Sequence, residues 1–119
     1  MTLELIQSLL GFVTPKEIID NFELVSINEK SDTIVLEFEE LSDLVPEKLK
    51  GKRYKNNGFW NKIDLHTFPQ KGKSCLLHIK RRKWEDQESG KSYGNHYELH
   101  PEGMKATKDF GAFIKKNHR

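Results

Sequence analysis

The stretch "LLHIKRRKW", residues 76–84, begins as an alternating strand and ends in four consecutive cations followed by a tryptophan. Apolar Leu77 and Ile79 are separated by polar His78, which is the period-two pattern of a β-strand that buries one face. The four cations are Lys80, Arg81, Arg82 and Lys83. Such a run is typical of a solvated strand end, but it also suits a surface that binds a polyanion.

A second strand is predicted directly upstream, in "FWNKIDLHTF", residues 59–68. The turn-forming sequence "PQKGK" at 69–73 joins it to the strand around Leu77, so the two strands are expected to pair as a hairpin. Its outward face then gathers Lys62, His66, His78, Lys80 and Arg82, with Trp60 and Trp84 at the same parity, Lys71 and Lys73 at the turn, and Lys52, Arg53 and Lys55 in the preceding loop. Aromatic residues interleaved with cations suit phosphate contacts and stacking on a base or sugar.

Charge is sorted along the chain, although the net charge is only +2. Residues 1–49 contain three basic and eleven acidic residues, whereas residues 50–83 contain eleven basic residues and one acid, Asp64. The middle segment therefore has a net charge of +10 and the first segment −8. Segregation of this kind creates a local field that the total charge hides, and it favours a polyanionic partner.

The alternating segments predict an α+β fold in a single domain, residues 1–119. Residues 22–29 and 33–40 flank the turn-like "KSD" and predict an antiparallel hairpin with an acidic, solvated side. A last strand is expected near residues 91–99, after the hairpin described above. The expected sheet is therefore antiparallel, with about five strands arranged as a hairpin plus a three-stranded meander.

Helical patterns occur at both ends of the chain. Residues 3–10 have apolar side chains at helical spacing, and Thr14 followed by proline is expected to cap a second short helix that buries Ile18 and Ile19. After Thr107, a C-terminal helix is predicted, and its core stripe contains Phe110, Phe113 and Ile114. Two short N-terminal helices and one C-terminal helix thus accompany the sheet.

Composition excludes several classes of function. The single cysteine, Cys75, rules out an internal disulfide and a cysteine-based zinc cluster, and its apolar phase in the strand predicts a buried, unreactive thiol. No apolar run approaches the roughly 20 residues of a membrane span. The first residues lack the features of a secretion signal, so a cytoplasmic protein without membrane contact is expected.

No catalytic residue, metal site or cofactor is predicted. His96 and His100 are four residues apart in a predicted strand, a separation of about 13 Å that is too long for shared coordination of one ion. A magnesium-binding carboxylate cluster is conceivable, but a solvated strand face is the better interpretation. The carboxylates concerned are Glu37, Glu39, Glu40 and Asp43.

Four pieces of the sequence occur in an order that resembles a known family. They are Gly58-Phe59, "DLHTFPQKGK" (64–73), "LHIKRRKWEDQESGKSY" (77–93) and "GMKATKDFGAFIKK" (103–116). Together with the earlier helix and hairpin pattern, they resemble the N-terminal, non-catalytic region of a family of bacterial insertion-sequence transposases (Aon type), over residues 15–117. Two departures are His66-Thr67, where an acidic residue is common in the family, and the segment "YGNHYELH".

The resemblance implies a role in transposition. It implies binding to the terminal inverted repeats of the element, as double-stranded DNA, and assistance to a DDE-type catalytic transposase subunit. The catalytic carboxylates are expected on that separate subunit or on a downstream domain. The residues that match the family motif are Lys80, Arg81, Arg82, Lys83 and Trp84, with Lys71 and Lys73 of the turn.

The sequence therefore predicts a non-enzymatic accessory DNA-binding domain, sequence-directed or non-specific, in which Arg81 or Arg82 is a candidate reader of guanine edges. The alternative is a protein-interaction module that forms a homodimer or scaffold, through contacts between the acidic N-terminal segment and the basic central segment of two copies. A small nuclease or an RNA-directed toxin would share the same basic surface. The sequence leaves the DNA site, the preferred strandedness and the oligomeric state open.

Overall fold

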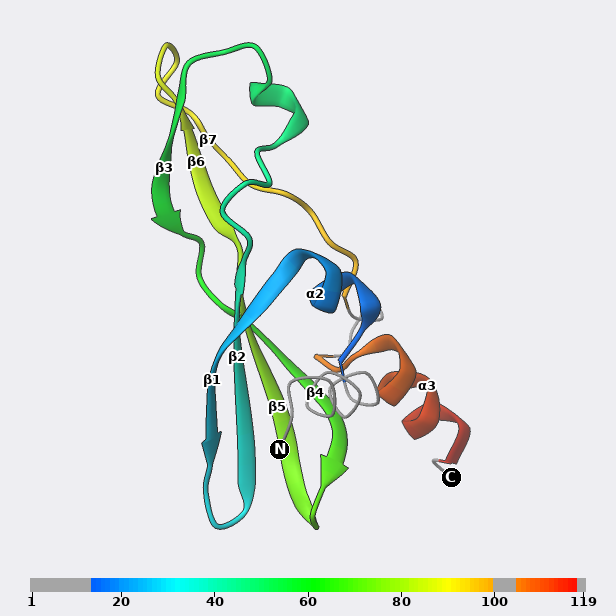
Figure 1. Cartoon of the computed structure of the whole chain (residues 1–119). Coiled ribbons are helices and arrows are strands. Elements are labelled where there is room, and N and C mark those ends of the chain that lie inside the picture. The colour runs from blue at the N-terminus through cyan, green and yellow to red at the C-terminus, as the bar shows by residue number, and fades with distance from the viewer. Residues whose placement is uncertain (1–13, 100–104, 118–119) are drawn as a thin grey trace.

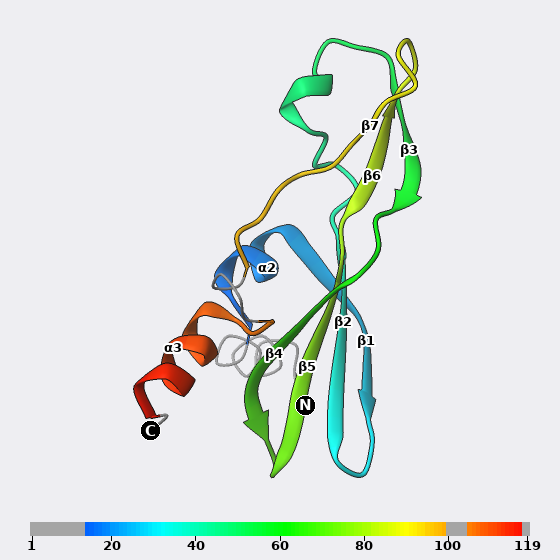
Figure 2. The same ribbon diagram turned by 180° about the vertical axis from the view of Figure 1, so that it is seen from behind.

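A computed structural model describes residues 14–99 and 105–117, and Figures 1 and 2 show it from opposite sides. Over these residues the fold is α+β, as predicted, with one four-stranded and one three-stranded sheet. In chain order the elements are α2 (Lys16–Asn21), β1 (Phe22–Glu29), β2 (Thr33–Glu40), the 3-10 turn η1 (Glu47–Leu49), β3 (Tyr54–Phe59), β4 (Ile63–Gln70), β5 (Lys73–Lys80), β6 (Arg82–Asp86), β7 (Ser92–Tyr93) and α3 (Lys108–Asn117). The helix predicted at residues 3–10 lies outside the described residues.

The four-stranded sheet has the order β1-β2-β5-β4. β1 and β2 form the predicted antiparallel hairpin with the predicted bounds, and β4 and β5 form the second hairpin. β2 and β5 are parallel, with Leu36 opposite Leu77, so the prediction of an antiparallel sheet throughout was wrong. The reason is the path of the chain: β3 and β4 run back along the molecule after β2, and β5 then turns to run beside β2 (Figure 1).

The β4–β5 turn contains only two residues, Lys71 and Gly72, and is shorter than the turn predicted at residues 69–73. Their φ angles are +53° and +71°, and a two-residue hairpin turn whose twist matches the strands requires positive φ at both positions. Gly72 adopts this conformation without steric cost. The turn is tied to the neighbouring hairpin because Lys73 Nζ donates to the carbonyl oxygen of Lys30 at 2.8 Å.

The three-stranded sheet, with the order β3-β6-β7, continues the β4–β5 hairpin beyond the first sheet. Residues 54–70 and 73–86 therefore form one long antiparallel ribbon, joined at its centre by a 2.9 Å hydrogen bond from Trp60 N to Arg81 O. The two arms were predicted as single strands over residues 59–68 and 74–84, with Lys55 in the preceding loop. Instead Lys55 lies in β3, which begins at Tyr54, and both arms are interrupted at this crossing. The last strand was also predicted too long, because β7 spans only Ser92–Tyr93. Seven strands in two sheets thus replace the five that were predicted in one.

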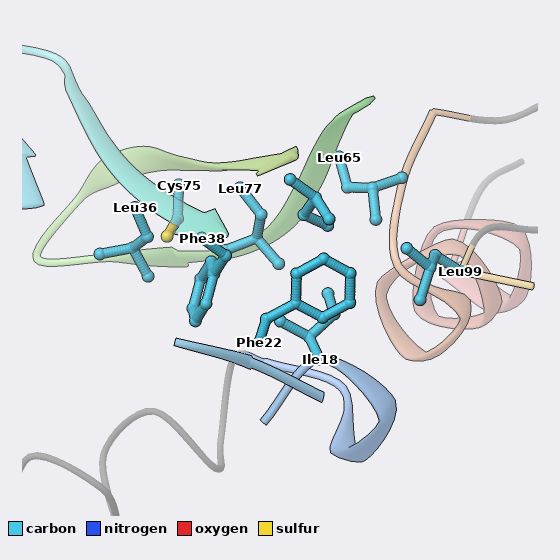
Figure 3. Packing of buried hydrophobic residues seen from close by; sticks show 9 residues of the cluster. Ile18, Phe22, Leu36, Phe38, Leu65, Cys75, Leu77 and Leu99 are labelled. Carbon is cyan, nitrogen blue, oxygen red and sulfur yellow. The ribbon is translucent and has the colours of Figure 1, made fainter. Parts of the chain in front are cut away.

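The core lies on one face of the four-stranded sheet (Figure 3). In the inner strands β2 and β5 and in the edge strand β4, alternation predicted the residues that face the core. Leu36, Leu77 and Leu65 are accordingly at most 5% exposed. The cluster is completed by α2 and by the segment after β7. Its members are Ile18, Phe22, Leu36, Phe38, Leu65, Cys75, Leu77, Ile79 and Leu99.

The N-terminal helix α2 buries less than predicted. Ile18 is fully buried, whereas Ile19 is 41% exposed, because a helix of six residues presents only one apolar position to the core. Thr14 does not cap this helix. Pro15 precedes its first residue and accepts the hydrogen bond from Ile18 N at 3.0 Å.

The C-terminal helix α3 begins as predicted, because Thr107 Oγ1 accepts a hydrogen bond from Phe110 N at 3.2 Å. Phe110 and Phe113 both pack edge-on against Phe68 of β4, with ring centroids 5.2 and 5.6 Å apart. The strand register shifts after Thr67, and Phe68 packs against α3. Phe113 is nevertheless 52% exposed, which corrects its assignment to a buried stripe.

Candidate nucleic-acid interface

The cations predicted to bind a polyanion are spread along the whole ribbon. Lys71 and Lys73 lie at the β4–β5 turn at one end of the molecule, and Lys55 lies in β3 toward the other end (Figure 1). The longest dimension of the molecule is 51 Å. The predicted positive residues are therefore not gathered into one compact patch, and each region of the ribbon must be considered separately.

At the centre of the ribbon, three cations lie over aromatic rings. The guanidinium carbon of Arg82 is 5.0 Å from the centroid of the Phe59 ring, and Lys80 Nζ is 5.9 Å from the same centroid. Lys83 Nζ is 4.9 Å from the ring centroid of Trp60. We call Phe59, Trp60, Lys80, Arg82 and Lys83 the aromatic–cation cluster. It has two parts on different faces of the ribbon, Phe59 with Lys80 and Arg82, and Trp60 with Lys83. Each contact of this kind contributes about 0.5–1 kcal/mol at an exposed site and keeps a long side chain in place.

Trp60 does not share the face of Lys80 and Arg82, so this part of the prediction was wrong. Phe59 pairs with Arg82 and Ile63 pairs with Ile79, which sets three residues of one arm opposite two of the other. The extra residue reverses the alternation between these two pairs. The indole of Trp60 instead lies beside Gly94, where an added Cβ would come within 2.4 Å of Nε1. A glycine is required there because the two segments approach so closely.

Trp84 is not a stacking platform either. Its exposed fraction is 5%, and its ring packs edge-on against Tyr54 with centroids 5.7 Å apart. It lies in the middle of β6, paired with Asn56 of β3 and Tyr93 of β7. The indole is therefore a core residue of the three-stranded sheet and presents no face to a nucleic-acid base.

Several predicted cations have acidic partners within the chain. These ion pairs are Lys52–Asp86 at 3.9 Å, Lys55–Glu85 at 4.0 Å, Lys62–Asp64 at 3.8 Å and Lys73–Glu29 at 2.7 Å. The hydrogen bond and positive charge of Lys73, with the charge of Lys71, hold the pKa of Glu29 below its ordinary value. Asp86 is buried, whereas Lys55, Lys62 and Asp64 are exposed. Exposed pairs contribute about 0–1 kcal/mol, so they lower the local positive field more than they stabilise the fold.

The outward face of the four-stranded sheet is close to charge-balanced. His78 of β5 lies opposite Glu37 of β2 and Asp64 of β4, with its ring nitrogens 3.8 and 3.5 Å from their carboxylate oxygens. Lys62 Nζ is 3.5 Å from His78 Nδ1. The parallel pairing of acidic β2 with basic β5 thus matches opposite charges within one sheet, and this face is a weak candidate for binding a polyanion.

Both arginines of the basic run are engaged by the protein. Arg81 Nη1 donates to the carbonyl oxygen of Asn95 at 3.0 Å, and Arg82 Nε donates to the carbonyl oxygen of Glu40 at 2.7 Å. Both side chains are only half-exposed. These bonds fix the crossing point of the ribbon against the segment after β7 and against the end of β2.

The role of Glu40, which is bonded to Arg82 of the cluster, was missed in the sequence analysis. It is fully buried, whereas the sequence analysis placed it in a solvated acidic cluster. Its carboxyl oxygens accept hydrogen bonds from Arg82 N at 2.9 Å, from Asn95 Nδ2 at 3.0 Å and from the hydroxyl of Tyr97. Burial, followed by the bond to Glu40, raises the pKa of Tyr97 well above its ordinary value. The parity of Glu40 with Phe38 was the available signal, since both lie on the inward side of β2.

The cations that keep an unneutralised charge are few. Among residues 14–99 and 105–117, no carboxylate oxygen lies within 4.0 Å of a side-chain nitrogen of the following predicted site residues: Arg53, Lys71, Lys80, Arg81, Arg82 and Lys83. The main-chain N–H of Arg82 is bonded to the buried Glu40 carboxylate. Three of these cations belong to the aromatic–cation cluster. The centre of the ribbon is therefore where the positive field of the middle segment is best preserved.

No group of three or more His, Cys, Asp or Glu in the described ranges is placed to hold a metal ion. Cys75 is buried, and burial raises the pKa of its thiol. No helix within the described ranges combines the length and apolar character needed to cross a membrane. Comparison with protein-family models, curated proteins and solved structures found no match in any of the three.

Proposed function

We propose that this chain is an accessory DNA-binding domain and that the aromatic–cation cluster is the centre of its DNA contact. The observation that carries the proposal is that Lys80, Arg82 and Lys83 lie over aromatic rings, and that within the described ranges none of their side-chain nitrogens lies within 4.0 Å of a carboxylate oxygen. Unneutralised cations held at a surface attract phosphate groups and release counterions when they bind.

The resemblance to insertion-sequence transposases supplies the biological setting of the proposal. The "IKRRK" motif that carries the resemblance is the same stretch that builds the crossing point of the ribbon. In this setting the domain is cytoplasmic, binds double-stranded DNA and works with a catalytic transposase subunit that supplies the chemistry. Lys71 and Arg53 extend the contact toward the two ends of the ribbon.

The double substitution Lys80→Ala with Lys83→Ala tests the proposal. We expect DNA affinity to fall and the slope of log K against log salt concentration to shrink by about 2, because each lysine–phosphate contact contributes about 1 to it. Fluorescence anisotropy of a labelled duplex, titrated with the full chain at several salt concentrations, measures both quantities.

The matched control is Lys16→Ala with Lys50→Ala. It removes the same charge, but each of these lysines is already paired with a carboxylate nearby in sequence, Asp20 and Glu47. The control is expected to keep nearly the parental slope. A slope that is unchanged in the Lys80 and Lys83 double variant, with folding intact by circular dichroism, would reject the cluster as the DNA contact.

A specific observation also favours self-association as a second candidate, although through a different surface from the contacts between acidic and basic segments that the sequence predicted. Among the strands that the structure describes, β1 is at the edge of its sheet, and its Val25 and Ile27 are 45% and 57% exposed. At the opposite edge, His66 of β4 is bonded through its main chain to residues 105 and 107. An apolar, unprotected edge strand is a template for pairing with another strand, here that of a second copy.

Ile27→Lys tests this second candidate. A lysine on an edge strand opposes strand addition, so any oligomer that forms through β1 should dissociate to monomers. Sedimentation velocity over a range of protein concentrations measures the change. A parent chain that stays monomeric at every concentration would exclude the self-association proposal and leave the DNA-binding proposal untouched.

A further inference from the structure

We infer that the aromatic–cation cluster holds the phosphate backbone of duplex DNA and does not read base sequence. This inference rests on the proposed function and narrows it. It assigns recognition of any particular DNA end to a different part of the transposition machinery, since the side chains here lack the geometry for it. Three features of the cluster lead to this conclusion.

The first feature is that the side chains of both arginines are hydrogen-bonded to the protein. Reading guanine in the major groove requires a guanidinium that projects from the protein and donates two hydrogen bonds to one base edge. Arg82 is held back at Nε by the carbonyl oxygen of Glu40 and lies over the Phe59 ring. Arg81 is held at Nη1 by Asn95, and its Nε atom is buried. One nitrogen of each guanidinium is therefore bonded to a carbonyl oxygen of the protein, which restricts its rotation toward a base edge.

The second feature is the use of the aromatic rings. Binding to single strands depends on ring faces on which bases stack. Trp84 is buried against Tyr54, and the Trp60 ring carries Lys83 with its Nε1 atom buried beside Gly94. The Phe59 ring carries Lys80 and Arg82. The rings therefore support the protein's own cations, and base stacking is not their role.

The third feature is that the remaining charged groups of the cluster are lysines. Lys80 and Lys83 present ammonium groups, which act as point charges and recognise phosphate without regard to the attached base. Duplex DNA carries about one charge per 1.7 Å of axis, a denser array than a single strand offers. A site made of point charges should therefore prefer a duplex over a single strand of equal length, irrespective of sequence.

Selection from a pool of randomised duplexes, using the full chain, tests the inference. We expect recovered DNA without an enriched motif, and individual recovered duplexes that bind within about twofold of one another with equal salt slopes. A single strand of the same length should bind about threefold more weakly or worse. Arg82→Lys, which keeps the charge but loses the planar fork, should leave the relative affinities of the duplexes unchanged.

The outcomes separate this inference from the proposed function. Enrichment of a motif that binds at least about tenfold tighter, with the preference abolished in Arg82→Lys, would overturn the inference while DNA binding itself stands. Preference for single strands would overturn it as well. Absence of binding to any DNA at low salt would overturn the proposed function, and the inference with it.

Discussion

Glu40→Ala is expected to lower the free energy of unfolding by about 3–5 kcal/mol, the size found when one member of a buried polar network is removed. The substitution leaves the main-chain N–H of Arg82, the side-chain amide of Asn95 and the hydroxyl of Tyr97 without their acceptor. A buried donor that loses its partner costs about 1–3 kcal/mol. These donors are half-buried and Asn95 Nδ2 keeps its bond to Leu44 O, so each contributes toward the lower end of that range. Urea denaturation followed by circular dichroism measures the change.

Two neighbouring variants make this result specific. Glu39→Ala removes a half-exposed carboxylate that is adjacent in sequence and lies on the other face of β2, so a loss below about 0.5 kcal/mol is expected. Glu40→Gln keeps the shape and one acceptor oxygen but turns an amide group toward the donors, and its loss should be intermediate. If Glu40→Ala unfolded within about 1 kcal/mol of the parent, the network would not hold the two sheets together.

Glu40 also connects the stability of the fold with the geometry of the aromatic–cation cluster. Glu40 lies where β2 ends and where the ribbon passes from one sheet to the other, and its main chain positions Arg82. Glu40→Gln is folded in our expectation, so it reports on the geometry of the aromatic–cation cluster without global unfolding. The carboxyl group of an acidic residue thus supports a positively charged surface from within the core.

Alternation along the chain was enough to predict the two hairpins. The bounds of β1 and β2 match the predicted ranges, and Leu77 and Ile79 are buried as their parity required. Parity fails where a strand gains a residue, and the bulge between Phe59 and Ile63 therefore moved Trp60 to the other side of the ribbon. The pairing of β2 with β5 depends on residues about forty positions apart, which no local pattern encodes.

The sequence also did not predict which residues are buried by segments that are distant along the chain. Trp84 and Glu40 were assigned to the surface, but Trp84 lies within the three-stranded sheet and Glu40 meets Asn95 and Tyr97. The separation of charge along the sequence predicted only part of the positive surface. Folding places the acidic β2 beside the basic β5, so part of the positive excess is neutralised within the protein, as at His78.

Leu77→Ala is expected to cost about 2–5 kcal/mol of stability, the range found for buried leucines whose removal leaves a cavity. Leu77 is fully buried at the centre of β5, opposite Leu36 of the parallel neighbour and Leu65 of the antiparallel neighbour. The lost side chain therefore weakens both pairings of the strand at once. The urea midpoint should fall while the slope of the transition is unchanged.

Leu76→Ala is the matched control for this prediction. It removes the same atoms from the adjacent residue of β5, but Leu76 is only half-buried and points to the opposite face, beside Val35 of β2. Because less apolar surface returns to water and no closed cavity forms, its cost should be well below that of Leu77→Ala. Equal losses for the two variants would mean that both faces of the four-stranded sheet are covered. The outward face would then be unavailable to any partner.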